Sequence, residues 1–225
     1  NSLLKLALKK KIKRTIFLGT SCIYPKFAKT PIREESLLTG ELEKTNQCYA
    51  IAKISGIKLC ESLYEDFNLD IICLMPTNVY GENDKFDKLD GHVIPAMIAK
   101  FETAKRYKKK IVKLLGTGRP LREFIHSNDL AEAIYFCLRI KKTSLKKLFK
   151  SKLPIINVGT KDEISIKKLS RLIANYTGYK GRVIFDKSFP DGTFRKNLDS
   201  SKINNLGWKP KINFKKSLRK LINLR

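Results

Sequence analysis

The sequence has 225 residues, which is enough to bury a substantial core in one or two domains. Its net charge is +26, but most of the 47 basic residues are lysines scattered along the chain, whereas specific nucleic-acid recognition favours arginine. This composition argues against a specific nucleic-acid site, and no apolar run is long enough to span a membrane. The five cysteines include no Cys-x-x-Cys pair, which indicates free thiols in the cytoplasm and no structural zinc site.

The first third of the chain predicts a strand–helix–strand unit. Residues 1–8 read as an amphipathic helix without a signal-peptide cleavage site, and the chain begins without Met, so we expect it to start partway into a larger protein. The pattern then predicts a strand over 15–19, a polar loop over 26–46, a helix over 47–68 and a strand over 70–75 that Pro76 ends. Continuous apolar runs of this kind indicate a parallel sheet covered on both faces.

The rest of the chain continues the alternation and places the protein in the α/β class. After a loop that runs through Gly91, the pattern predicts a helix over 94–107, a strand over 110–115, a turn over 116–120 and a helix over 130–139 capped by Ser127 or Asn128. A basic connector over 141–152 follows. Beyond it we expect a strand over 155–158, a helix over 165–177, a strand over 182–186, a loop over 187–198 and two short C-terminal helices. A Gly-rich phosphate-binding turn does not follow the first strand. Either no dinucleotide binds, or that turn lies upstream of Asn1.

A hydroxyl group at a strand end and a Tyr-x-x-x-Lys helix predict a carbonyl-reducing site. Thr20 and Ser21 follow the first strand, and Tyr49 precedes Lys53 by one helical turn. Reduction of a ketone needs a proton donor, and a nearby lysine favours the tyrosinate form of such a donor. Asn78 follows the next strand, where ligands of parallel sheets bind. Ordinary loop polarity and an exposed helix pair are the simpler alternatives.

Further candidates are a thiol, an imidazole and several cations. Cys22 is either a proton-transfer group near the carbonyl site or a small buried residue. His92 lies in a loop, where an imidazole suits acid–base chemistry or is simply solvated, and His126 reads as structural. The cations that could hold a phosphate-bearing substrate are Lys100, Arg122, Arg195 and Lys196.

Several motifs together resemble those of the GDP-L-fucose synthases, which are sugar-nucleotide epimerase–reductases of the extended short-chain dehydrogenase/reductase superfamily. They are Leu18-Gly-Thr-Ser-Cys-Ile-Tyr-Pro, Asn46-Gln-Cys-Tyr-Ala-Ile-Ala-Lys, Met75-Pro-Thr-Asn-Val-Tyr-Gly, His92-Val-Ile-Pro-Ala, Arg122-Glu-Phe-Ile-His and Asp191-Gly-Thr-Phe-Arg-Lys. The resemblance runs from about Thr15 to near the C-terminus. It implies an incomplete Rossmann-like, doubly wound parallel sheet with a smaller α/β substrate-binding domain, because the family's Gly-rich turn would precede this chain.

The resemblance also implies a reaction, a cofactor and roles for individual residues. The substrate would be GDP-4-keto-6-deoxy-D-mannose, epimerised at C3 and C5 with Cys22 and His92 as the acid–base pair and then reduced at C4 with NADPH (bound as NADP). Thr20, Tyr49 and Lys53 would serve the reduction, with Thr20 standing where the family has Ser. The residues lining the cofactor would be Tyr49, Lys53, Pro76, Thr77, Asn78, Val79 and His92, and those binding substrate would be Asn78, Lys100, Leu115, Arg122, Asp191 and Lys196.

The same resemblance suggests a domain division and a homodimer. Residues 1–78 and 123–160 would belong to the dinucleotide-binding domain, and residues 79–122 and 161–225 to the substrate domain. Two alternatives remain open at this point. One is another epimerase, dehydratase or reductase of the superfamily, and the other is a non-catalytic, basic RNA-binding protein derived from such an enzyme.

Overall fold

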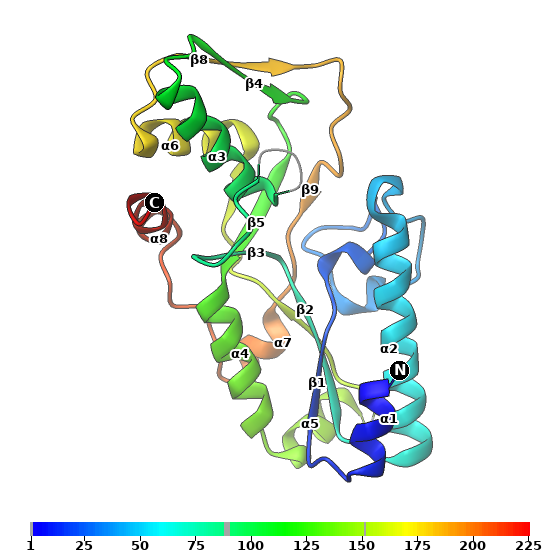
Figure 1. Cartoon of the computed structure of the whole chain (residues 1–225). Helices are drawn as coiled ribbons and strands as arrows, with labels where there is room; N and C mark the ends of the chain where they lie inside the picture. Colours follow the sequence, from blue (N-terminus) through cyan, green and yellow to red (C-terminus); the bar gives the residue numbers. More distant parts are fainter. Residues whose placement is uncertain (1, 88–90, 151) are drawn as a thin grey trace.

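The computed structural model describes residues 2–87, 91–150 and 152–225 as an elongated α/β protein (Figure 1). Three predicted features touch the residues outside this range: Asn1 of the N-terminal helix, residues 88–90 of the loop before Gly91, and Ser151 of the basic connector. The helices are α1 (Ser2–Lys9), α2 (Gln47–Phe67), α3 (Val93–Arg106), α4 (Ser127–Arg139), α5 (Lys142–Phe149), α6 (Ile166–Thr177), α7 (Ser201–Asn205) and α8 (Phe214–Asn223). The strands are β1 (Thr15–Leu18), β2 (Ile71–Pro76), β3 (Asn78–Tyr80), β4 (Ile111–Leu115), β5 (Leu121–His126), β6 (Ile155–Val158), β7 (Glu163–Ser165), β8 (Arg182–Asp186) and β9 (Arg195–Lys196).

A parallel sheet in the order β1-β2-β6 forms the centre of one half of the molecule. Every residue of β2 is buried, and its side chains alternate between two hydrophobic cores. Ile71, Cys73 and Met75 pack with α1 and α2, while Ile72 and Leu74 pack with α4, α5 and α7. The continuous apolar run of this strand therefore reflects cover on both faces, as the sequence predicted.

The other half contains a second core and the remaining strands. Strand β5 lies between β3, which is parallel to it, and the antiparallel β7, and it also pairs with the short parallel strand β9. Strands β4 and β8 form a separate parallel pair. Helices α3, α6 and α8 contribute Phe101, Leu169 and Leu218 to the core of this half. In Figure 1, α3 and α6 lie near β4 and β8, at the end of the molecule opposite α5.

The α/β class and the long elements are confirmed, and four local predictions are wrong. Helix α4 begins at Ser127, and its cap is His126, whose Nδ1 accepts a hydrogen bond from the Asn128 amide at 3.2 Å. The 141–152 connector contains helix α5, the 187–198 loop contains β9, and the loop predicted to run through Gly91 contains β3. Strands β5 and β7 lie where no element was predicted. These elements are short or carry charged residues, so they leave little periodic signal.

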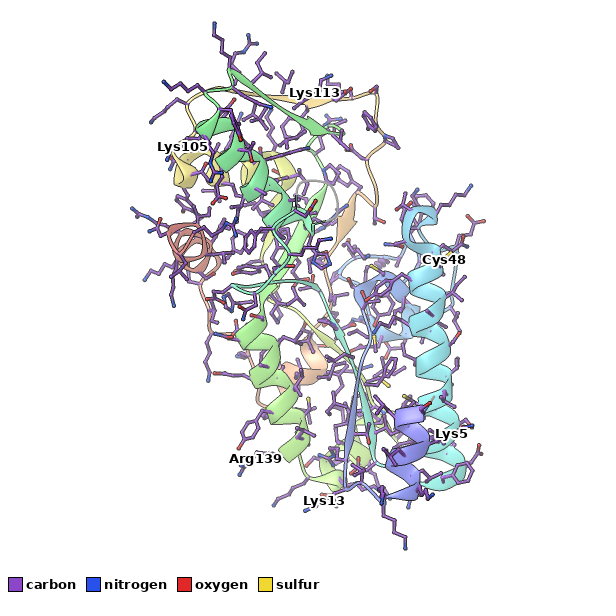
Figure 2. The ribbon with its side chains drawn as sticks, viewed as in Figure 1. Lys5, Lys13, Cys48, Lys105, Lys113 and Arg139 are labelled. Carbon is purple, nitrogen blue, oxygen red and sulfur yellow. The ribbon has the colours of Figure 1, made fainter. Side chains whose placement is uncertain are left out.

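The basic side chains are spread over the outside of both halves. Figure 2 shows Lys5, Lys13, Lys105, Lys113 and Arg139 at the edges of the molecule, on different elements. Within the described ranges, no helix combines the length and apolar character that crossing a membrane requires. The described residues also include no cluster of three or more His, Cys, Asp or Glu side chains that could hold a metal ion.

Candidate active site

A cavity of about 690 Å³ lies at the carboxyl ends of β1 and β2. The predicted catalytic residues Thr20, Cys22, Tyr49, Lys53 and His92 all line it, together with the predicted cofactor residues Pro76, Thr77, Asn78 and Val79. They come from the turn after β1, from α2, from the end of β2 with β3, and from the start of α3. The fold therefore brings together, in one cavity, residues that lie up to 72 positions apart in the sequence.

Tyr49 and Lys53 lie on the face of α2 that borders the cavity. The Lys53 ammonium donates a hydrogen bond to the Leu18 carbonyl at 2.9 Å. It also lies 5.8 Å from the centre of the Tyr49 ring and 5.6 Å from that of Phe17. Lys53 is thus held between the end of β1 and the ring of Tyr49.

The turn after β1 presents two polar side chains. Thr20 Oγ1 accepts a hydrogen bond from the Cys22 amide at 3.2 Å and so caps the 3-10 turn Ser21–Ile23. A threonine hydroxyl has one donor and two acceptor positions, so this cap leaves its O–H able to donate to a substrate carbonyl.

Cys22 is half-buried, and its sulfur contacts two nitrogen atoms. Lys196 Nζ lies 3.2 Å from Cys22 Sγ, and Asn46 Nδ2 lies 3.3 Å from it. Lys196 is on β9, which pairs with β5 in the other half of the molecule. Lys196, which we predicted to face the nucleotide, therefore lies beside the thiol.

His92 immediately precedes α3 and is 81% exposed. Its Nδ1 lies 3.3 Å from Asp84 Oδ1, and the Asp84 side chain is itself only 15% exposed. A carboxylate in this position can orient the imidazole ring. Asp84 was not among the predicted site residues, and its place in a polar loop gave no local signal.

A second cavity of about 270 Å³ adjoins the first through Val93, which lines both. Four predicted substrate-binding residues line it: Lys100, Leu115, Arg122 and Asp191. The predicted catalytic residues thus line the first cavity, and these four predicted substrate-binding residues line the second. Of the other two predicted substrate-binding residues, Asn78 lines the first cavity and Lys196 lies beside Cys22.

The side chains of the second cavity are held by backbone and hydroxyl groups. Arg122 Nη1 donates to the carbonyls of Leu121 and Thr193, both at 2.7 Å. Burial lowers the pKa of the Arg122 guanidinium from its usual value, and the charge of Asp191 acts in the opposite direction. Asp191 accepts bonds from the amide and hydroxyl of Thr117, which ties the 187–194 loop to the turn after β4.

Glu123 is a further residue that sequence reasoning missed. Its carboxylate is fully buried and accepts hydrogen bonds from the amides of Thr160, Lys161 and Leu198 at 2.5, 2.7 and 2.9 Å. Its own carbonyl accepts from Thr77 Oγ1 at 2.9 Å and Asn78 Nδ2 at 2.8 Å. Burial raises the pKa of this carboxyl, which the three amide bonds oppose. The one sequence signal that could have indicated Glu123 was its position as a charged residue inside the Arg122-Glu-Phe-Ile-His motif.

Comparison with known proteins shows the family to which this fold and cavity belong. Residues 1–159 match the NAD dependent epimerase/dehydratase family, and the chain belongs to that family. It is 46% identical over 207 residues to "Probable GDP-L-fucose synthase 1" of Oryza sativa subsp. japonica, a match covering 92% of this chain and 60% of the relative. The chain thus spans about 60% of the length of this curated relative.

Two solved structures from Campylobacter jejuni extend the comparison. A GDP-6-OMe-4-keto-L-xylo-heptose reductase is similar with a TM-score of 0.90 and 34% identity, covering 99% of this chain and 72% of the other. A GDP-D-glycero-L-gluco-heptose synthase, solved in the presence of NADPH, is similar with a TM-score of 0.82 and 31% identity, covering 98% and 72%. Both support the Rossmann-like fold of the central sheet and its helices.

Proposed function

We propose that the chain carries the catalytic part of a GDP-L-fucose synthase. In this proposal GDP-4-keto-6-deoxy-D-mannose is epimerised at C3 and C5 and is then reduced at C4 with NADPH. The single observation that carries the proposal is the cavity that unites Cys22 and His92 with Thr20, Tyr49 and Lys53. The similarity to the rice GDP-L-fucose synthase supports the choice of substrate.

The residues at the ends of β1 and β2 fit a reduced nicotinamide. Pro76 and Val79 would contact the nicotinamide ring as an apolar wall. Lys53, whose ammonium lies beside the Leu18 carbonyl, would donate hydrogen bonds to the ribose hydroxyls. NADPH would supply the hydride for C4. Tyr49 would give its proton to the C4 oxygen, while Lys53 stabilises the tyrosinate that remains. Thr20 would donate a hydrogen bond to the same oxygen and hold it in place.

Epimerisation requires two groups in addition to Tyr49. A base removes the proton from C3 or C5, the electron pair moves toward the 4-keto oxygen to form an enolate, and an acid returns a proton to the opposite face. Cys22 follows β1 and His92 precedes α3, so different elements present them to one cavity. Thr20 and Tyr49 would stabilise the enolate oxygen by donating hydrogen bonds.

The nucleotide would occupy the second cavity. Lys100 and Arg122 provide positive charge for the diphosphate, with Leu115 and Asp191 lining the same space. We further propose that residues 1–78 and 123–160 hold the cofactor, and that residues 79–122 and 161–225 hold the sugar nucleotide. Two features support a cytoplasmic homodimer: all five cysteines are free thiols, and Ile51 on the long helix α2 is 49% exposed.

Deuterium exchange tests the proposed function. The protein expressed from its whole gene is incubated with the keto-sugar nucleotide and NADPH in D₂O, and the product is analysed by NMR. We expect deuterium at both C3 and C5 of a fucose product. Cys22→Ser and His92→Asn should each reduce this incorporation by roughly 10²-fold or more, which is the usual scale for a lost acid or base. Equal incorporation in both variants and the parent would contradict the assignment.

A second candidate is a reductase that acts on another GDP-4-keto sugar without epimerising it. The similarity to the heptose reductase, with its TM-score of 0.90, favours this alternative. The same experiment separates the two functions. A plain reductase would oxidise NADPH while leaving C3 and C5 free of deuterium, because it never forms the enolate.

A further inference from the structure

The sulfur of Cys22 is the acceptor for two nitrogen donors that reach it from different parts of the chain. Lys196 Nζ approaches from β9 at 3.2 Å, and Asn46 Nδ2 approaches from the residue before α2 at 3.3 Å. A neutral thiol is a weak acceptor, whereas a thiolate is a strong one. Two donors on one sulfur atom are the surroundings that a thiolate requires.

The two donors differ in what they can offer to a neutral thiol. Asn46 Oδ1 is buried without a hydrogen-bond partner in the described structure, so rotation of the amide would let this oxygen accept the S–H of a thiol. Asn46 can therefore serve either protonation state of Cys22. Lys196 carries only donors, so its contact favours the thiolate alone.

The electrostatic surroundings of Cys22 are mainly positive. The titratable or charged groups that share its cavity or act on it are Lys196 on β9, Arg122 on β5, Tyr49 and Lys53 on α2, and His92 before α3. A negative charge on Cys22 would raise the pKa of the Arg122 guanidinium, so the two groups lie near each other. Glu43 is also near Arg122, but its carboxylate pairs with Lys26 at 3.2 Å.

We propose that Lys196 is a positioning residue that holds Cys22 in the thiolate form required for proton abstraction, with Asn46 as the second donor. In the reaction, the thiolate would take a proton from a carbon beside the 4-keto group, forming the S–H bond as the C–H electron pair moves into the enolate. This use of the pair rests on the proposed function. The contact between Lys196 and Cys22 does not, and it can be tested without any sugar nucleotide.

The test is the pH dependence of Cys22 alkylation. The parent protein is treated with iodoacetamide between about pH 5 and pH 10, since only the thiolate reacts at an appreciable rate. Mass spectrometry follows the peptide that carries Cys22, and exposed Cys48 serves as an internal reference in each digest. In Lys196→Met we expect the midpoint of the Cys22 rate to rise by about one pH unit, which lowers the rate near neutral pH by up to about tenfold.

Three further variants separate charge from packing. Lys196→Arg keeps a cation and should stay near the parent midpoint. Asn46→Asp keeps the shape of Asn46 but places a carboxylate beside the sulfur, so its midpoint should also rise. Lys187→Met removes one exposed lysine elsewhere and should leave the Cys22 midpoint unchanged. The reactivity of Cys48 should remain constant throughout, and circular dichroism checks that each variant is folded.

The outcomes decide between a role in thiolate formation and a merely structural contact. A folded Lys196→Met protein with the parent midpoint would overturn the proposal, as would a Lys196→Arg midpoint that rises as far as that of Lys196→Met. If Lys196→Met does not fold, Asn46→Asp decides: an unchanged midpoint in that variant overturns the proposal. Failure of the deuterium experiment together with the expected alkylation shifts would remove the epimerase assignment and leave the Lys196–Cys22 pair established.

Discussion

Tyr49 illustrates how a single residue is prepared for its proposed role. Its ring is 52% exposed at the cavity, and the Lys53 ammonium 5.8 Å from the ring centre is anchored on the Leu18 carbonyl. The anchor matters because a lysine side chain has many rotamers, and a fixed one loses less entropy when substrate binds. The donor and its charge partner are therefore arranged before any ligand arrives.

This arrangement predicts the effect of Tyr49→Phe. The variant lacks the proton donor for the C4 oxygen, so NADPH oxidation with the keto-sugar nucleotide should fall by roughly 10²–10⁴-fold. Cys22, His92 and Thr20 remain in place, so deuterium should still enter C3 and C5, but more slowly, because one of the two donors to the enolate oxygen is lost. Retention of most of the parent oxidation rate would show that another group protonates the oxygen.

At the scale of elements, the approach of α2 to β1 depends on Gly56. A Cβ atom at this position would overlap the ring of Phe17 on β1. The same ring lies 5.6 Å from Lys53 Nζ, so the glycine lets the strand come close enough to help place this lysine. Gly56 therefore connects helix packing with the geometry of the cavity.

Gly56→Val should destabilise the protein for this reason. Forcing extra methyl groups against Phe17 costs about 1–3 kcal/mol, which exceeds the gain from replacing glycine in a helix. Urea unfolding of the variant and the parent measures the difference in free energy. Ala52→Val is the matched control, because Ala52 is exposed on the same helix, and its stability should change by less than about 0.7 kcal/mol. Equal stability of Gly56→Val and the parent would mean that the contact relaxes freely.

Local sequence patterns predicted the helices and strands whose apolar residues recur regularly. They failed for elements that are stabilised mainly by contacts with distant parts of the chain. Strand β2 is a continuous apolar run and was found, but β5 contains Arg122 and Glu123, which resemble loop residues. Glu123 is tolerated in a buried strand only because the amides of Thr160, Lys161 and Leu198 satisfy its carboxylate. Those donors lie at least 37 residues away, beyond any local window.

For the candidate site too, local sequence patterns indicated some residues and missed those whose partners lie far away in the chain. Residues that follow strand ends, such as Thr20 and Asn78, were found because the carboxyl edge of a parallel sheet is where ligands bind. The family resemblance added Cys22 and His92. The partners Asn46 and Asp84 were missed, since their roles depend on hydrogen bonds that only the folded chain makes.

For the whole molecule, the charge of +26 is distributed over both halves, not concentrated on one surface. Several of the described cations pair with carboxylates on distant parts of the chain, including Lys211 with Glu132 and Arg33 with Asp199. Exposed pairs of this kind contribute little to stability individually. The excess charge is therefore a property of the solvated surface and not of a built binding site.

This distribution predicts weak, unselective binding to nucleic acids. Counterion release gives any strongly basic protein some affinity at low salt, and that affinity falls steeply as salt increases. Fluorescence anisotropy with several RNA and DNA sequences, at about 20 and 150 mM salt, would measure both the affinity and its selectivity. We expect similar affinities for all sequences and little binding at the higher salt. Tight, sequence-selective binding at the higher salt would favour a nucleic-acid function.

The contact between Lys196 and Cys22 joins positions separated by 174 residues. During synthesis, Cys22 leaves the ribosome long before Lys196, and the two meet only after both halves of the molecule have packed around β5. An unfinished or partly unfolded chain therefore lacks the lysine partner of Cys22, and the proposed thiolate base would form only in the completed fold. Cells would in this way make a reactive sulfur available only where a substrate cavity already surrounds it.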